Sequence, residues 1–542
     1  MSALNFLLAL SPIILLIIEM IPFKMPAKKA APTALLLMIV LALTYFRADG
    51  ADAGAILSNY LSLNKFANGS SSAIVWKGLL EGLKIVLMVF CAFLILNTLQ
   101  KTHAIDQIKV AISSITDDRR AQVIIIGLFM PIFLEGAAGA GAPAAIAAPF
   151  LVALGINPVT AIIIALMGDA TPCSWGGAGL TTITGGNALV AAGLSTEALN
   201  SAMVGRLHMF GVMVMPFLMI AIAFGRKGFK NLIPYLAFSG VSSGLVMFII
   251  SNFIGPETTS LGTGLISILL SVVYLRFVGI KTPDEFKTDK GFKVSAEGSR
   301  YKVWQALLPY ICMLVLLPIV RYGSEMIAAP WYGEGKTLYN VITSLGYIVW
   351  VDAVLFICAI IGAIALKVKA GDFLVTMRDT LKKVMPVCIV LSSLLIVAYI
   401  MQDTVTTAAT HNGETMSIIK MIAKTIADAV GPFYPALAVL IGSIGSFVTG
   451  TGLGSNVMFA PLHIEAAASL DISAVTVFAG QNAGGSLGNL ICPNNVAAAC
   501  ATVGENGHEG YVIRRAMVAF CTILVLYMAL TMLYTYVMFP GA

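Results

Sequence analysis

The sequence predicts an all-α polytopic membrane protein with about 12–14 transmembrane segments. Hydrophobic residues make up 58% of the 542 residues and charged residues only 11%, and the mean hydropathy is +0.91. A soluble domain carries about 25% charged residues. Apolar runs of about 20 residues recur along the chain, and helices satisfy the backbone hydrogen bonds of such runs in lipid. The composition therefore excludes soluble enzymes, nucleic-acid-binding proteins and disordered scaffolds.

The apolar runs set the expected spans. The first run is taken as a helix rather than a signal peptide, because no basic residue precedes it and no small-residue cleavage site follows it. The clear runs occupy residues 4–21, 31–46, 73–99, 203–225, 231–254, 261–278, 303–320, 341–366, 384–401 and 516–538. Two further runs, 121–134 and 433–448, lead directly into segments rich in glycine and alanine, where we expect broken or re-entrant helices.

Lysine and arginine gather in alternate loops and predict the orientation. The loops 24–30, 101–120, 226–230, 276–302, 367–383 and 514–515 hold 24 of the 33 basic residues. Basic loops face the cytoplasm, so both termini are predicted to lie outside. No loop is long enough for a soluble domain, and residues 1–542 are predicted to form one transmembrane domain.

Two segments with matching landmarks predict an internal duplication. Gly136 and Gly450 are 314 residues apart, and Gly168 and Gly480 are 312 apart. The helix before the first segment starts inside and the helix before the second starts outside, so the copies are expected to be inverted. Repeat 1 is predicted at about 73–225 and repeat 2 at about 384–538, with 226–383 as connecting or scaffold helices. Inverted repeats with re-entrant hairpins and broken helices are typical of secondary transporters.

The small-residue segments 136–143, 168–179, 450–456 and 480–495 are predicted to form the substrate site. Helix N-termini in such segments offer free N–H groups and a positive dipole end, and these bind anions. Side-chain hydroxyls and amides would add neutral hydrogen bonds. The alternative is that these glycines and alanines only let helices pack closely. The candidate substrate-binding residues are Gly136, Ala137, Gly139, Thr171, Ser174, Thr451, Ser455, Asn456, Gln481, Asn482, Asn489 and Asn494.

Ionisable residues inside spans are candidates for proton coupling. Glu135, Asp169 and His463 fall in or beside the broken segments, and the alternative for each is a structural hydrogen bond or a helix cap. His208 is expected near the membrane interface. The sequence predicts no cofactor, no metal site and no nucleic-acid partner. The expected partners are a small organic anion, the proton and the lipid bilayer.

Three runs in the same regions carry a family resemblance. FLEGAAGAGAPAAIAAPFLVALG, GSFVTGTGLGSNVMFAPL and AGGSLGNLICPNNVAAACATVG occur in this order and together resemble the lactate permease family of bacterial inner-membrane carriers. The resemblance implies proton-coupled uptake of lactate and related 2-hydroxymonocarboxylates such as glycolate. It also implies kinship with a wider group of anion carriers that have inverted repeats and paired re-entrant hairpins, many of which are thought to work as elevators. The positions that match the family are Glu135, Gly136, Gly139, Pro143, Asn456, Gly484, Gly485 and Pro493.

The chain also departs from the family pattern. Asn489 stands where the family's GKMISP motif has lysine, and Cys492 stands where that motif has serine. Residues 450–456 read GTGLGSN where the family pattern is GSDTSSN. These departures point to a divergent branch of the family and leave another small organic anion open as the substrate.

Three other functions compete with proton symport. A sodium-coupled carrier would use unwound carbonyls near Asn456 and Asn482 as ligands. A membrane enzyme or a respiratory-complex subunit needs a metal cluster or a nucleophile–base arrangement, and five scattered histidines do not suggest either. A passive channel fits less well, because broken helices rich in hydrogen-bonding groups suit an alternating binding site better than an open pore.

Overall fold

Helices build almost the whole protein, as the sequence predicts. The computed structural model describes residues 3–20, 23, 25–47, 52–67, 72–138, 142–287, 301–344, 347–411 and 413–541. Within these residues nine helices are long and apolar enough to cross a membrane, or ten if the pair Pro158–Ala170 and Pro172–Ala191, bent by 45°, is one span. This is fewer than the predicted 12–14, because several other apolar helices are too short to span alone: Leu4–Met20, Pro143–Ala153 and Val349–Ala365.

The helices fall into the following order along the chain. The N-terminal part contains α1 (Ala3–Met20), α2 (Ala27–Leu43), α3 (Ala53–Leu61), α4 (Leu63–Ala67) and α5 (Ile74–Lys101). A first broken region follows with α6 (Ala104–Ser113), α7 (Arg119–Ile124), η1 (Ile125–Phe129), α8 (Met130–Ala138), α9 (Ala142–Ala153), α10 (Pro158–Ala170), η2 (Pro172–Trp175), α11 (Gly176–Ala191) and α12 (Glu197–Phe224). The middle of the chain contains η3 (Gly225–Phe229), α13 (Ile233–Phe253), α14 (Pro256–Phe277), η4 (Asp284–Phe286), α15 (Val303–Glu325), α16 (Leu338–Thr343) and α17 (Tyr347–Ala365).

The C-terminal part repeats the same order of elements. It contains α18 (Ala370–Asp403), β1 (Val405–His411), β2 (Glu414–Ser417), α19 (Ile418–Val430), η5 (Gly431–Phe433), α20 (Tyr434–Thr449), α21 (Gly452–Leu470), α22 (Ala474–Gly488), α23 (Pro493–Val503), α24 (Glu509–Leu533) and η6 (Tyr534–Met538). The antiparallel hairpin β1–β2 is a small exception to the all-α prediction. Both parts run from a long helix through a short helix, a helical hairpin and a broken helix to a second long helix.

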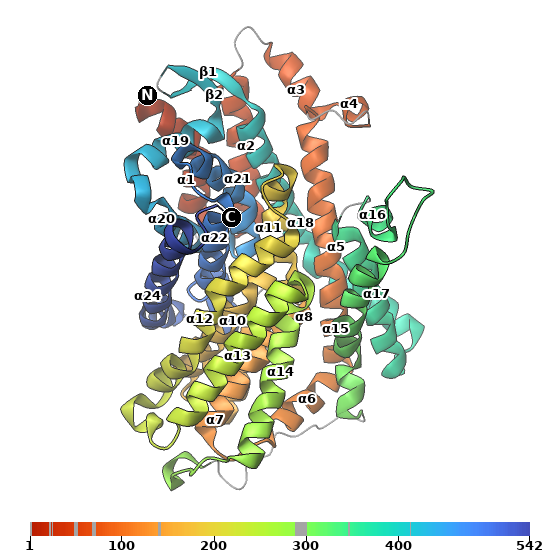
Figure 1. Cartoon of the computed structure of the whole chain (residues 1–542), viewed down its shortest axis with the longest axis vertical. Helices are drawn as coiled ribbons and strands as arrows, with labels where there is room; N and C mark the ends of the chain where they lie inside the picture. Colours follow the sequence, from red (N-terminus) through yellow and green to blue (C-terminus); the bar gives the residue numbers. More distant parts are fainter. Residues whose placement is uncertain are drawn as a thin grey trace.

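The two broken regions pack against each other in a reciprocal way. In each region, the helix after the break packs on the second arm of the other region's hairpin. Helix α11, after the first break, packs on α21, the second arm of the C-terminal hairpin. Helix α23, after the second break, packs on α9, the second arm of the first hairpin. In Figure 1, α7 lies at the bottom of the view and α19 near the top, so the two hairpins are approached from opposite ends of the molecule.

Helices α5, α15, α17 and α18 form a group beside these regions, called here the flanking helices. Helix α5 packs on α17 and α18, and α15 packs on α17. In Figure 1, α5, α15 and α17 run along the right side of the view. The backbones of α5 and α18 approach closely because Gly78 and Gly82 face the contact, where a Cβ on Gly82 would lie 3.1 Å from Ser392 Cα.

The helices of the middle segment 226–383 pack in two different places, some against the first broken region and some among the flanking helices. Helices α13 and α14 pack against α12, α8 and α11, on the side of the first broken region. Helices α15 and α17 belong to the flanking helices instead. The repeat boundaries remain a prediction, and the packing favours assigning only α15–α17 of this segment to a scaffold.

A buried arginine joins three loops at the lower end of the molecule. Arg120 donates from Nε and Nη2 to the two carboxylate oxygens of Asp118, at 3.0 and 2.7 Å. Its Nη1 donates to the carbonyls of Gly228 and Lys230, and its guanidinium lies 4.4 Å from the centre of the Phe286 ring. One side chain therefore holds α7, the turn after α12 and the segment after α14 together.

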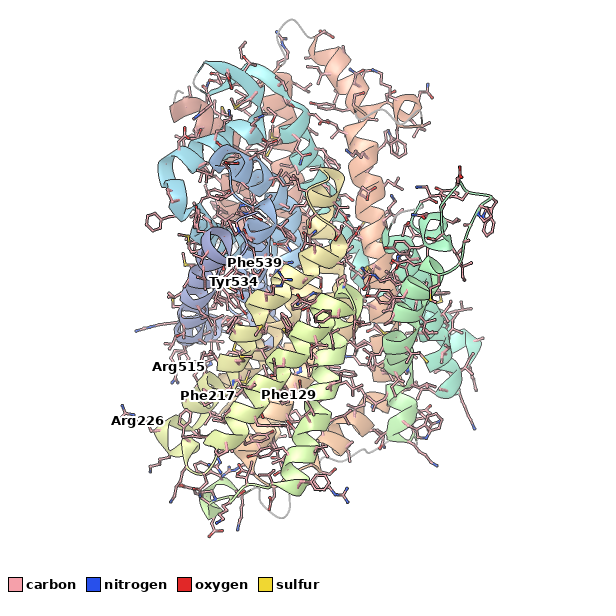
Figure 2. The ribbon with its side chains drawn as sticks, in the orientation of Figure 1. Phe129, Phe217, Arg226, Arg515, Tyr534 and Phe539 are labelled. Atoms are coloured by element: carbon pink, nitrogen blue, oxygen red, sulfur yellow. The ribbon has the colours of Figure 1, made fainter. Side chains whose placement is uncertain are left out.

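Replacing Arg120 with methionine is expected to lower the free energy of unfolding by about 3–5 kcal/mol, because Asp118 would keep a buried charge without its partner. The measurement is thermal unfolding of the purified protein in detergent. Arg226 is the control, because it is exposed and points away from the protein at the lower left of Figure 2. Equal melting temperatures for Arg120→Met and Arg226→Met would contradict the structural role of Arg120.

Candidate functional site

The C-terminal hairpin turns at Gly450, whose φ of +82° suits a residue without a Cβ. The next residue, Thr451, caps α21 by accepting the N–H of Gly454 at 3.0 Å. The N–H groups of Gly452 and Leu453 belong to the first turn of α21, where no intrahelical acceptor exists.

The first broken helix opens through an unusual run of backbone. Gly177, Ala178 and Gly179 have φ values of 56°, 57° and 84°, so three successive residues adopt the left-handed conformation. Gly179 also lies against Pro256, where an added Cβ would be 2.6 Å from the carbonyl carbon. The regular part of α11 therefore starts after Gly179, and its first N–H groups face the break rather than a helical turn.

A small cavity of about 60 Å³ lies where the hairpins and breaks meet. Its walls come from α8, the break before α11, the tip of the C-terminal hairpin, the break after α22, and one valine from each of α5 and α18. The lining residues are Val89, Glu135, Cys173, Gly176, Gly177, Leu180, Thr181, Val387, Thr451, Gly452, Leu453 and Asn489. Of the predicted site residues, the cavity contains Glu135, Thr451 and Asn489.

Two predicted proton-coupling residues meet beside this cavity. Glu135 lies near the end of α8 and Asp169 near the end of α10, with 1% and 0% of their surfaces exposed. The carboxyl of Asp169 is within hydrogen-bonding reach of the carboxyl of Glu135. Apart from this carboxyl, neither oxygen of Asp169 has a hydrogen-bond partner among the described residues. The two acids thus form a buried carboxyl pair at the cavity wall.

The residues around the first break bond to the other broken region. The backbone N–H of Ser174 donates to Ser486 Oγ at 3.2 Å. Ser486 Oγ in turn donates to the carbonyls of Ala170 and Thr171. The hydroxyl of Thr171 is buried without a partner in the described part of the chain. Ser174 and Thr171 therefore lie at the junction of the two regions, although neither lines the cavity.

Asparagines of α22 and of the following break continue this junction. Asn482 Nδ2 donates to Thr182 Oγ1 at 2.8 Å. Asn489 accepts from Ser446 Oγ at 2.7 Å and donates to Cys173 Sγ at 2.6 Å. Asn489 thus lines the cavity and also holds, by a hydrogen bond, the thiol of the lining residue Cys173.

The third predicted proton-coupling residue, His463, belongs to a separate buried network. Tyr434 OH lies 2.9 Å from His463 Nδ1, and His463 Nε2 lies 2.8 Å from Gln481 Oε1. Gln481 Nε2 donates to Ser455 Oγ and Asn456 Oδ1. Because the amide oxygen of Gln481 can only accept, Nε2 of His463 donates and Nδ1 accepts from the tyrosine.

This network ends at the wall of the cavity. Asn456 Nδ2 donates to the carbonyl of Thr181 at 3.2 Å, and Thr181 is a lining residue on α11. The predicted residues Ser455, Asn456 and Gln481 therefore join α21 to α22 and α11. They do not line the cavity.

Several predicted residues lie elsewhere. Gly136 and Ala137 are in the last turns of α8, where a helix end offers carbonyls rather than N–H groups. Gly136 instead allows close packing on α14, because an added Cβ would be 2.8 Å from Leu261 Cα. Asn494 is exposed at the start of α23. Gly139 lies outside the described residues.

His208 is not interfacial as expected, because it is fully buried. Its Nδ1 lies 2.8 Å from Tyr527 OH, and its Nε2 lies 2.8 Å from Ser174 Oγ. The only sequence signal for this role is that His208 interrupts an otherwise apolar stretch, which does not identify its partners.

A second, larger cavity of about 470 Å³ is called here the vestibule. It is bounded by α5 and α18 on one side and by α11 and α21 on the other. Three of its lining residues, Ile85, Thr184 and Val457, are one helical turn from the small-cavity residues Val89, Thr181 and Leu453. On each of these three helices, one helical turn therefore separates the lining of the vestibule from the lining of the small cavity.

Comparison with known proteins places this arrangement in a family. The family model described as L-lactate permease matches residues 5–329 and 324–539. The chain belongs to the L-lactate permease family. Similar proteins include the L-lactate permease of Escherichia coli K12, 26% identical over 96% of this chain and 94% of the relative. The L-lactate permease of Bacillus subtilis 168 is 27% identical over 76% and 78%, and the glycolate permease GlcA of E. coli K12 is 24% identical over 94% and 92%.

Membership in the L-lactate permease family makes this chain a multi-pass bacterial membrane transporter. The fold also resembles that of MtrF from Neisseria gonorrhoeae, whose structure is described as illuminating a class of antimetabolite efflux pumps. That likeness has a TM-score of 0.52 at 14% identity and covers 94% of this chain and 95% of MtrF. The likeness concerns the fold alone.

Proposed function

We propose that this protein imports a small monocarboxylate, with L-lactate and glycolate as first candidates, by proton symport. The observation that carries the proposal is the small cavity at the junction of the two broken regions, with Glu135 in its wall and Asp169 beside Glu135. The names of the relatives, L-lactate permease and glycolate permease, agree with this substrate class.

The cavity has the features that a small anion requires. The first turn of α21, with Gly452 and Leu453, and the break before α11, with Gly176 and Gly177, both contribute backbone to its wall. Helix N-termini bind carboxylates through free N–H groups and the positive dipole end. A cavity of about 60 Å³ holds roughly four waters, so only a small solute fits it. The hydroxyls of Thr181 and Thr451 suit the 2-hydroxyl of such an acid.

The carboxyl pair is the proposed proton carrier. Two neighbouring carboxylates in a buried site favour holding one proton between them, because two negative charges there repel each other at low dielectric. Binding of a proton together with the anion keeps the net charge of the loaded site unchanged, which lowers the desolvation cost of moving it. His463 is left out of this path, because both of its ring nitrogens are already bonded.

The moving part is proposed to contain both hairpins and both broken helices, in inverted copies, sliding as an elevator against α5, α15, α17 and α18. Hydrogen bonds across the junction support this division, since Ser174–Ser486, Asn482–Thr182 and Asn456–Thr181 tie the two regions into one body. The flanking helices reach the small cavity only through the aliphatic side chains of Val89 and Val387 among its described lining.

The test is uptake of radiolabelled L-lactate and glycolate into proteoliposomes that contain the purified protein. An inward proton gradient is expected to drive accumulation of at least one of these acids without sodium. Accumulation that requires a sodium gradient at fixed pH would instead establish the sodium-coupled alternative. Absence of uptake of any small monocarboxylate under either gradient would reject the proposed substrate class.

A further inference from the structure

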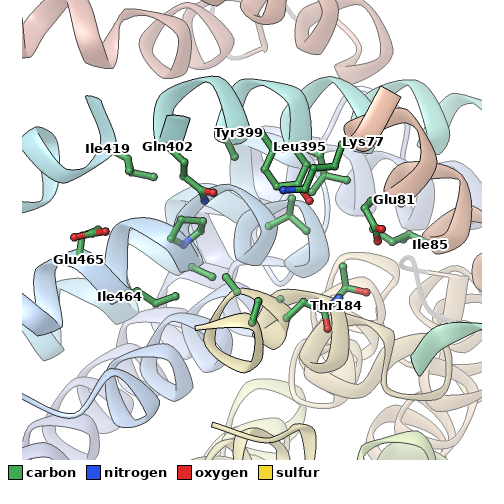
Figure 3. A pocket seen from close by; sticks show the side chains of 18 of the residues that line it. Lys77, Glu81, Ile85, Thr184, Leu395, Tyr399, Gln402, Ile419, Ile464 and Glu465 are labelled. Carbon is green, nitrogen blue, oxygen red and sulfur yellow. The ribbon is translucent and has the colours of Figure 1, made fainter. Parts of the chain in front are cut away.

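The vestibule contains a charge that the proposed transport mechanism does not use. Its charged lining residues are Lys77 and Glu81 on α5 and Glu465 on α21. Figure 3 shows Lys77, Tyr399 and Glu81 together on the side of α5 and α18, with Thr184 on the opposite wall. Gln402 and Ser417 also line it, which places it beside the β1–β2 hairpin.

The two acids of the vestibule are neutralised by lysines that do not line it. Glu81 pairs with Lys84 at 2.9 Å, and Glu465 lies 3.9 Å from Lys420. Lys77 has no ion pair within 4.0 Å in the part of the chain that the structure describes. Asp403, at the end of α18, interacts electrostatically with Lys77 at longer range and forms no ion pair with it. Lys77 is therefore the lining charge that has no direct ion pair among the described residues, and its ammonium can donate to an anion that enters the vestibule.

An aromatic ring holds this charge in place. The Nζ of Lys77 lies 4.3 Å from the centre of the Tyr399 ring, within the range of a cation–π contact. The ring face is a weak partner that offers no hydrogen-bond acceptor, so the ammonium keeps its N–H donors for a ligand. Gln402 lines the same cavity one turn further along α18 and adds an amide.

The position of Lys77 separates it from the transport site. Val89 of the small cavity is twelve residues after Lys77 on α5, which is about 18 Å along a helix. A bound anion cannot contact both at once. Since the vestibule ends one turn from the small cavity, an anion held at Lys77 stands at the start of the path into it.

We propose that Lys77, held by Tyr399 and assisted by Gln402, forms a docking site for a carboxylate, occupied before the anion reaches the small cavity. The chemistry recognised is a single small carboxylate, and its identity as the transported acid rests on the proposed function. The site favours a carboxylate over a neutral solute of the same size, because the ammonium of Lys77 can donate a charge-assisted hydrogen bond to it.

The kinetic test compares Lys77→Gln and Lys77→Arg with Lys65→Gln, whose lysine is exposed on α4 and does not line the vestibule. Lys77→Gln is expected to raise the KM for uptake about five- to tenfold at low ionic strength with little change in kcat, the size of one charge-assisted contact. The difference shrinks at high salt. Lys77→Arg and Lys65→Gln are expected to keep the wild-type KM.

Tyr399 supplies a second variant pair. Tyr399→Phe keeps the ring and is expected to behave as wild type, whereas Tyr399→Leu is expected to raise KM. A structural defect would lower kcat and the yield of protein instead. An unchanged KM in Lys77→Gln, or a loss of kcat alone, would overturn the docking site while leaving the proposed function intact.

A chemical test does not depend on transport. The wild-type protein is treated with a water-soluble acetylating reagent, and the modified lysines are quantified by peptide mass spectrometry. L-lactate, glycolate and acetate are expected to slow acetylation of Lys77 severalfold and to leave Lys65 unaffected. Equal rates at Lys77 with and without all three acids would overturn the docking site, even if the protein transported none of them.

Discussion

Replacing Glu135 with glutamine is expected to abolish accumulation driven by a proton gradient while leaving exchange of internal for external substrate intact. Glutamine keeps the size and the hydrogen-bonding ability of the protonated acid, so the loaded carrier can still cross. It cannot release a proton, so the empty carrier cannot complete a cycle of net uptake. Asp169→Asn is expected to have the same effect, because the two carboxyls lie within hydrogen-bonding reach and would hold one proton together.

The measurement is uptake and counterflow in the same proteoliposomes, with Glu334→Gln as the control because Glu334 is an exposed acid away from both cavities. Glu334→Gln is expected to match the wild type in both assays. Full gradient-driven uptake by Glu135→Gln would remove Glu135 from the proton path. Loss of exchange together with uptake would point to damaged substrate binding instead.

The second large effect is expected from Gly484→Ala, which should leave almost no folded protein. Gly484 lies on α22 where this helix crosses α20, and an added Cβ would clash with the carbonyl oxygen of Val439 and lie 2.7 Å from its carbonyl carbon. Both contacts are with backbone, which cannot rotate away. The expected loss of stability is about 3 kcal/mol or more.

The yield of monodisperse protein in detergent and its melting temperature measure this effect. Gly510→Ala is the matched control, because nothing lies within 4 Å of an added Cβ at Gly510 in α24. Alanine there is expected to be neutral or slightly stabilising, since it favours a helix by about 1 kcal/mol over glycine. Similar behaviour of the two variants would show that α20 and α22 are not packed this closely.

The sequence predicts the helices and the broken regions well, because both depend on local features. Hydropathy marks the spans, and the small-residue segments mark the turns, so the run ending at 448 is found as α20 ending at Thr449. The equal spacing of glycines also indicates the repeated order of elements. These signals require no knowledge of which segments meet in space.

The site residues are harder to predict because their roles depend on contacts between segments about 300 residues apart. Ser174 meets Ser486, and Asn456 meets Thr181, only after the two regions pack together. Polar residue type alone therefore cannot separate residues that line the cavity from those that join helices. The cavity residue Cys173 has no sequence signal beyond its place in the first break.

The departures from the family pattern fall on the cavity itself. Asn489 and Gly452 both line it, and they stand where the pattern has lysine and aspartate. At these two positions the chain therefore offers an amide and a bare backbone in place of two charges. An anion bound here would meet backbone N–H groups at helix N-termini rather than a fixed cation.

The unequal volumes of the two cavities have a practical consequence. A carboxylic acid with a bulky apolar tail fits the 470 Å³ vestibule but not the 60 Å³ cavity. Such a compound would bind in the vestibule without being transported. It would inhibit substrate transport only from the face on which the vestibule opens. The measurement is uptake into vesicles in which the protein has one known orientation, repeated for the opposite orientation. Inhibition in only one of the two would show on which face the vestibule opens.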